Sequence, residues 1–73
     1  MSMHDQAKRL DTVVAEAEKL AAHARVAAHH FRTGEVPRGA AHALSVEGHF
    51  LNIRTELEAI AKEHAARSQP VIG

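Results

Sequence analysis

Apolar residues recur at alternating steps of three and four along two long stretches of this chain. This spacing places them on one face of an amphipathic α-helix. The pattern therefore predicts an all-α protein built from two long helices, each with one apolar seam. The first seam is Met3, Ala7, Leu10, Val14, Ala17, Ala21, Ala24, Ala28 and Phe31. The second is Ala43, Val46, Phe50, Ile53, Leu57, Ile60 and His64.

A short break between the two stretches predicts a tight turn. Gly34 suits the left-handed position that ends a helix, and Pro37 suits the first turn of the next one because its φ is fixed near the helical value. We expect one domain, with a first helix over residues 3–33, a turn over 34–37, a second helix over 38–67 and a frayed tail over 68–73. So short a connection predicts an antiparallel two-helix hairpin.

The two seams also predict a register for the hairpin. Small residues of the first helix would face larger ones of the second, with Ala24 against Phe50 as the central layer. The same register sets Leu10 opposite His64 at the open end. His64 would then be a half-buried end residue or, alternatively, a pH sensor that becomes charged inside the seam on acidification.

A second apolar band on the second helix is left over by this pairing. It predicts that two hairpins associate into a four-helix bundle as a homodimer. Gly48 supports contact there, because a mid-helix glycine costs about 1 kcal/mol unless another backbone comes close. The alternative is that these are ordinary scattered surface residues. The expected interface residues are Leu44, Gly48, Leu51 and Thr55, with Val13 and Leu20 on the first helix.

Composition supports self-association and limits the partners. Of the 73 residues, 45% are hydrophobic, but alanine is the commonest of them, so the core of a lone hairpin would be thin. Nine acidic residues balance nine basic ones, which gives no net attraction to nucleic acid or anionic lipid. Cysteine is absent and no apolar run approaches the ~18 residues of a membrane span. We expect a cytoplasmic protein with a protein partner, and no nucleic-acid or membrane partner.

Seven histidines are the one compositional hint of chemistry. Two ligands on one helix share a metal at i, i+3 or i, i+4, and no His–His or Glu–His pair has that spacing. His42 and His49, the best candidates, are seven residues apart and therefore about 10.5 Å apart along the helix. A metal would need ligands from two helices or two chains, so we expect no bound metal or other cofactor.

Basic residues gather near the turn. They predict a docking patch for an acidic partner or a phosphate, or else they complement the C-terminal dipole of the first helix. The residues of this patch are Arg25, His29, His30, Arg32 and Arg38.

The sequence favours a non-catalytic function. It has no cysteine or tyrosine, no glycine-rich phosphate loop and no recognisable catalytic triad. We expect a small helical interaction or adaptor module that acts through self-association and partner docking. The alternative is a helical bundle that binds a metal or haem through histidines from two helices or two chains.

Overall fold

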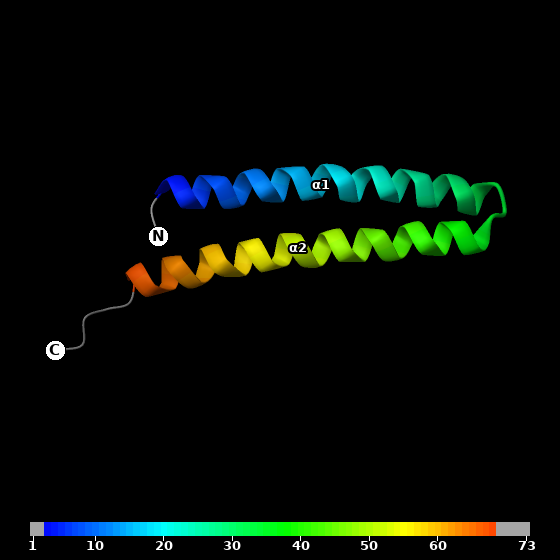
Figure 1. Ribbon diagram of the computed structural model, residues 1–73. Helices are drawn as coiled ribbons and strands as arrows, with labels where there is room; N and C mark the ends of the chain where they lie inside the picture. The colour runs from blue at the N-terminus through cyan, green and yellow to red at the C-terminus, as the bar shows by residue number, and fades with distance from the viewer. Residues whose placement is uncertain (1–2, 69–73) are drawn as a thin grey trace.

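The computed structural model describes residues 3–68 as two helices joined by a tight turn (Figure 1). Helix α1 spans Met3–Arg32 and helix α2 spans Val36–Ser68. The two helices pack against each other and run antiparallel, which confirms the predicted all-α hairpin. Helix α2 begins two residues earlier than predicted and includes Ser68. The rest of the predicted frayed tail, residues 69–73, lies outside the described residues.

The turn is built by a Schellman motif at the end of α1. Gly34 has a φ of 80°, the left-handed value that its sequence position predicted. The Glu35 N–H donates to the His30 carbonyl at 2.8 Å, and the Gly34 N–H donates to the Phe31 carbonyl at 3.2 Å. Pro37 lies in the first turn of α2, where its missing N–H removes no helical hydrogen bond.

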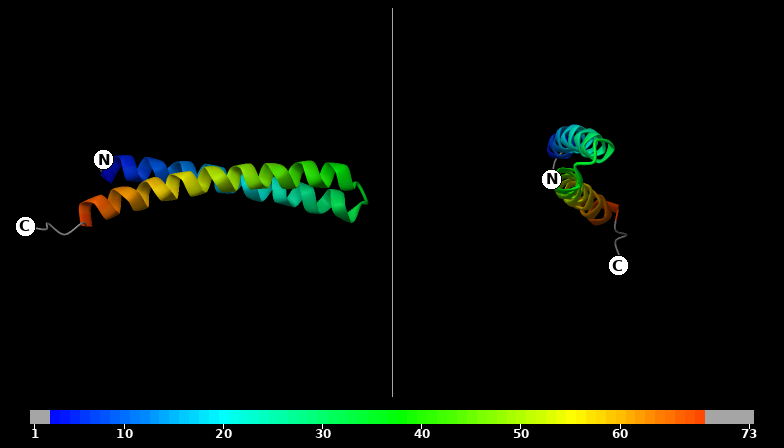
Figure 2. Two further views of the ribbon diagram at one scale, coloured as in Figure 1. Left: turned by 90° about the horizontal axis from the view of Figure 1, so that it is seen from below. Right: turned by 90° about the vertical axis from the view of Figure 1, so that its right-hand side faces the viewer.

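The helices stay side by side along their whole length, and one crosses the other at a shallow angle (Figure 2). Their facing positions are mostly half-buried, because two helices cover only one stripe of each other. Within residues 3–67, only Ala27 and Gly39 are buried. Neither helix, over its described length, is apolar enough to cross a membrane. The half-buried apolar residues of this seam are Val13, Leu20, Val46, Ile53 and Ile60.

The predicted register is wrong. Leu10, Phe50 and Leu57 were expected inside the seam, but they are 48%, 52% and 47% exposed. Ala24 is also exposed, so it does not receive Phe50 within the hairpin, and His64 is exposed at the open end. On each helix, the polar residue one position earlier faces the other helix instead. A one-residue step rotates a side chain by about 100°, which moves the predicted apolar seam to the side of the hairpin. The pairing is also displaced along the axis, because His23, which precedes Ala24, pairs with His42 and not with His49, which precedes Phe50.

Candidate functional site

Within the described residues, a series of polar pairs joins α1 to α2 and, at its last member, to Glu35 in the turn. Arg9 Nη1 donates to Glu56 Oε2 at 3.0 Å. His23 Nδ1 lies 3.4 Å from His42 Nδ1. The partners recur every seven residues on both helices, so they stack two helical turns apart and form what we call the polar ladder. Its pairs are Arg9–Glu56, Glu16–His49, His23–His42 and His30–Glu35.

The middle of the polar ladder is a column of four imidazole rings, the histidine column. His49 stacks on His23 with ring centroids 5.2 Å apart, and His23 lies 5.6 Å from His42. His42 in turn stacks on His30 at 5.4 Å. The column therefore places half-buried histidines from both helices in one continuous row, which no spacing along a single helix could produce.

A carboxylate closes the column at one end. Glu16 Oε2 contacts His49 Nδ1, and both side chains are mostly covered, with 16% and 20% exposed. This hydrogen bond from His49 lowers the pKa of Glu16, against the opposing effect of desolvation, and Asn52 lowers it further. The carboxylate is thus held in its charged form inside the seam.

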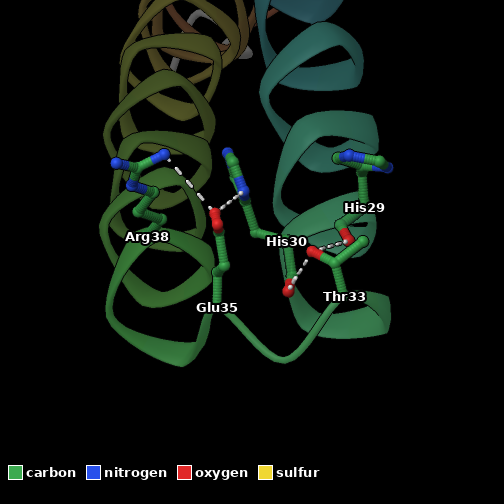
Figure 3. Close-up of polar contacts among 5 residues, drawn as sticks. All are labelled: His29, His30, Thr33, Glu35 and Arg38. Carbon is green, nitrogen blue, oxygen red and sulfur yellow. Dashed lines mark hydrogen bonds and ion pairs between the residues drawn. The ribbon is translucent and has the colours of Figure 1, made fainter.

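Glu35 closes the other end of the column at the turn, as Figure 3 shows. Its Oε2 lies 3.0 Å from His30 Nδ1 and 3.5 Å from Arg38 Nη1. The Thr33 hydroxyl donates to the carbonyls of His29 and His30 at 3.2 and 3.1 Å. The last turn of α1 and the first turn of α2 are thereby tied together by polar contacts.

The predicted basic docking patch is split by this arrangement. His30 lies in the seam, with its side chain only 17% exposed, so it is not part of an outer surface. Arg25, His29, Arg32 and Arg38 are exposed. Glu35 reduces the positive charge at Arg38, because the two side chains form an ion pair. Docking of an acidic partner or a phosphate at the exposed residues of this patch remains a prediction.

The two predicted metal candidates do not pair with each other. His42 faces His23, and His49 faces Glu16, each from the opposite helix. Within the described part of the chain, no three histidine, aspartate or glutamate side chains are grouped so that they could hold a metal ion. His23 Nδ1 and His42 Nδ1 approach each other to 3.4 Å, a pairing that the sequence analysis did not identify.

Exposed apolar residues from both helices lie along one side of the hairpin. Residues that follow ladder positions point sideways, and in an antiparallel pair they lie on the same side of both helices. Met3 and His64 line one hollow at the open end, in agreement with this arrangement. We call this surface the lateral apolar face. Its large residues are Met3, Leu10, Val14, Phe31, Phe50 and Leu57, all about half exposed or more.

The two sides of the hairpin differ in polarity. Between the large residues of the lateral apolar face run Ala17, Ala21, Ala24 and Ala28, which we call the alanine stripe. The opposite side is more polar, because Thr12, Lys19, Ser45 and Asn52 lie there, although Val26 and Ala59 continue the same series. The hairpin is therefore amphipathic as a whole, and its apolar side is open to solvent.

The interface residues predicted from the sequence lie on two different parts of the hairpin. Leu44, Gly48, Leu51 and Thr55 are exposed on the outer side of α2. Val13 and Leu20, predicted at the same interface, lie elsewhere. They are half-buried and alternate with the ladder residues, so they face α2 within the hairpin.

One close contact was missed by sequence reasoning. Gly39 lies against the Phe31 ring, and a Cβ at residue 39 would come within 2.9 Å of Phe31 Cδ2 and Cε2. Gly48, in contrast, has nothing within 4 Å of a Cβ position in the hairpin. Phe31 lies eight residues before Gly39, so the tight turn itself was the signal that could have indicated this contact.

Comparison with known proteins does not assign the chain to a family. No family model matches it, and neither a curated protein nor a solved structure matches it significantly. The function must therefore be argued from the polar ladder and the lateral apolar face.

Proposed function

We propose that this protein is a non-catalytic helical interaction module that works as a homodimer, with two hairpins joined through their lateral apolar faces into a four-helix bundle. The observation that carries the proposal is the reversal of polarity in the hairpin. Arg, Glu and His side chains occupy much of the seam, whereas Leu10, Phe50 and Leu57 face solvent. A second copy would cover these residues and complete a core that one chain lacks.

The size of the face supports a second copy as the occupant. A helix of 30 residues is about 45 Å long, and two packed helices are about 20 Å wide. One side of the hairpin thus offers about 900 Å², which is close to the ~800 Å² per partner of a standard protein interface. A small peptide would leave most of this surface exposed.

The shape of the face is also complementary to itself. Helix α1 contributes the alanine stripe, and α2 contributes the bulky Phe50 and Leu57. A two-fold axis would bring α2 of one copy onto α1 of the other, so that large side chains meet small ones on both sides. Val14, Ala17 and Ala21 line a shallow hollow with Glu18 and Arg25 at its rim, which suits a ring such as that of Phe50.

In the adaptor role, a further protein would bind to the surfaces that the proposed dimer leaves exposed. Leu44 and Leu51 lie on the outer side of α2, away from the lateral apolar face. His29 and Arg32 lie toward the turn end of α1, beyond the hollow that Arg25 borders. These two regions remain free in the proposed bundle and would receive a further protein partner, with an acidic surface at the turn end.

Charge substitutions on the two apolar surfaces test the proposal. Phe50→Glu places a carboxylate in the centre of the proposed interface and should convert the dimer into a monomer of 7.9 kDa in light scattering. Leu44→Glu is the matched control, because Leu44 is exposed on the same helix but outside the lateral apolar face. Dissociation by Leu44→Glu and not by Phe50→Glu would refute the proposed interface in favour of the outer band of α2.

A further inference from the structure

We infer that His23 and His42 form a binding site for a divalent transition metal such as Zn²⁺, which would join α1 to α2 in the middle of the polar ladder. The inference does not depend on self-association, because both ligands belong to one chain. It rests on the position of two imidazole nitrogens from different helices.

The separation of the two nitrogens fits a shared ion. His23 Nδ1 and His42 Nδ1 are 3.4 Å apart. Zinc binds histidine nitrogen at about 2.0–2.1 Å with tetrahedral geometry, which places two ligand nitrogens about 3.3–3.4 Å from each other. Ligation by both nitrogens requires each ring to turn until its Nδ1 lone pair points at the ion instead of at the other nitrogen. Zinc would bind both rings as neutral Nε2–H tautomers, which leave the Nδ1 lone pair of each ring available as a ligand.

The surroundings favour a cation at this point. Glu16 and Glu35 lie at the two ends of the histidine column and contribute negative charge to the seam. His49 and His30 stack directly on the two ligand rings and restrict their orientation. Orientation of a ligating imidazole by its neighbours strengthens metal binding.

The site would be open and exchangeable. Since the described residues provide no set of three protein ligands, water would complete the coordination of the metal. Such a site releases its ion to chelators, unlike a structural zinc site with four protein ligands. The ion would act as a reversible cross-link that stabilises the hairpin in proportion to the free metal concentration.

Zinc titration of the full chain, prepared without an affinity tag and treated with chelator, tests the inference. Thermal melting followed by circular dichroism should show a melting temperature that rises with Zn²⁺ and does not rise with Mg²⁺, which prefers oxygen ligands. His23→Gln and His42→Gln should each weaken zinc binding by at least ~10-fold in calorimetry. The matched controls His29→Gln and His64→Gln alter exposed histidines outside the column and should bind zinc like the unmodified chain.

A spectroscopic readout separates direct ligation from loss of folding. In ¹⁵N NMR of the imidazoles, saturating zinc should move the Nδ1 resonances of His23 and His42 more than those of His29 and His64. No zinc-dependent rise in melting temperature, or an equal rise in His23→Gln and His42→Gln, would overturn the inference. Nδ1 shifts confined to exposed histidines would overturn it as well.

Discussion

Two glycines of α2 have opposite surroundings at the scale of single residues. The Phe31 ring fills the space beside Gly39, whereas nothing within the hairpin approaches Gly48. The sequence analysis attributed a close contact to Gly48 and none to Gly39. The reason is that a mid-helix glycine signals a close approach but does not identify the neighbour, which depends on the register.

The two glycines therefore give a paired prediction. Gly48→Ala should raise the free energy of unfolding by about 1 kcal/mol, because alanine is the better helix former and has room. Gly39→Ala should not show this gain. Its free energy of unfolding should lie below that of the unmodified protein by roughly 1–3 kcal/mol, because the new Cβ displaces the Phe31 ring. Urea denaturation measures both. A stability loss in Gly48→Ala would contradict the proposed bundle and support a partner backbone at the outer band.

Glu16 makes the acid stability of the protein depend on one hydrogen bond. Its folded-state pKa lies below the unfolded value near 4.5 because of the hydrogen bond from His49. Because the pKa of Glu16 is lower in the folded state, its stabilisation of the fold is present above the unfolded-state pKa. It is lost as the pH falls through the lower, folded-state pKa. The hydrogen bond between His49 and the Glu16 carboxylate should therefore contribute to stability at neutral pH, and this contribution should vanish in acid.

Glu16→Gln tests this dependence. The melting temperature of the variant should lie below that of the unmodified chain at neutral pH, and the difference should shrink as the pH is lowered below about 4.5. Glu18→Gln is the matched control for removing one carboxylate from α1, since Glu18 is exposed two residues away. A difference that stays constant with pH would show that Glu16 acts through packing rather than charge.

At the scale of the helices and the turn, the sequence was most informative. The steps of three and four predicted both helices, and Gly34 with Pro37 predicted the turn to within two residues. These signals are local, because they depend only on backbone preferences and on neighbours along the chain.

Gly34 supplies the prediction for the turn. Gly34→Ala should destabilise the hairpin by about 1 kcal/mol, because a side chain disfavours the φ of 80° found there. Gly34→Asn should cost less, since asparagine tolerates the left-handed region. Equal losses of melting temperature in the two variants would argue against a left-handed residue at this turn.

The facing stripe of each helix was predicted wrongly for a physical reason. Two stripes one residue apart have the same steps of three and four, and alanine fits either of them. The sequence analysis assigned the more apolar stripe of each helix to the seam. This assignment assumed that the hairpin buries its apolar residues without a partner. The polar ladder was visible in the sequence as charged and histidine residues seven apart on both helices, such as Arg9 and Glu16 against His49 and Glu56. Which of these residues contact one another depends on how the two helices pair, and the spacing along one helix does not determine that pairing.

At the scale of the whole molecule, one hairpin leaves the large apolar residues of its lateral apolar face exposed to solvent. The small-to-large match between Ala24 and Phe50 that predicted the internal register is absent within the chain, since both residues are exposed. The proposed dimer would pair such residues between two copies. Ala24→Leu should therefore overpack the proposed dimer interface and lower its stability by roughly 1–3 kcal/mol.

Ala22→Leu is the control for this prediction, because Ala22 is exposed away from the lateral apolar face. Denaturation at high and low protein concentration should show that only Ala24→Leu weakens the concentration-dependent form. Equal effects of the two substitutions would place Ala24 in solvent in the working state of the protein.

The central claim is that the lateral apolar face is covered by a second copy. Sedimentation equilibrium of the unmodified chain, combined with helicity at 222 nm over the same concentration range, tests it most directly. We predict a mass of twice 7.9 kDa at micromolar concentration, with dissociation and loss of helicity together on dilution. A fully helical particle of 7.9 kDa at every concentration would contradict the account.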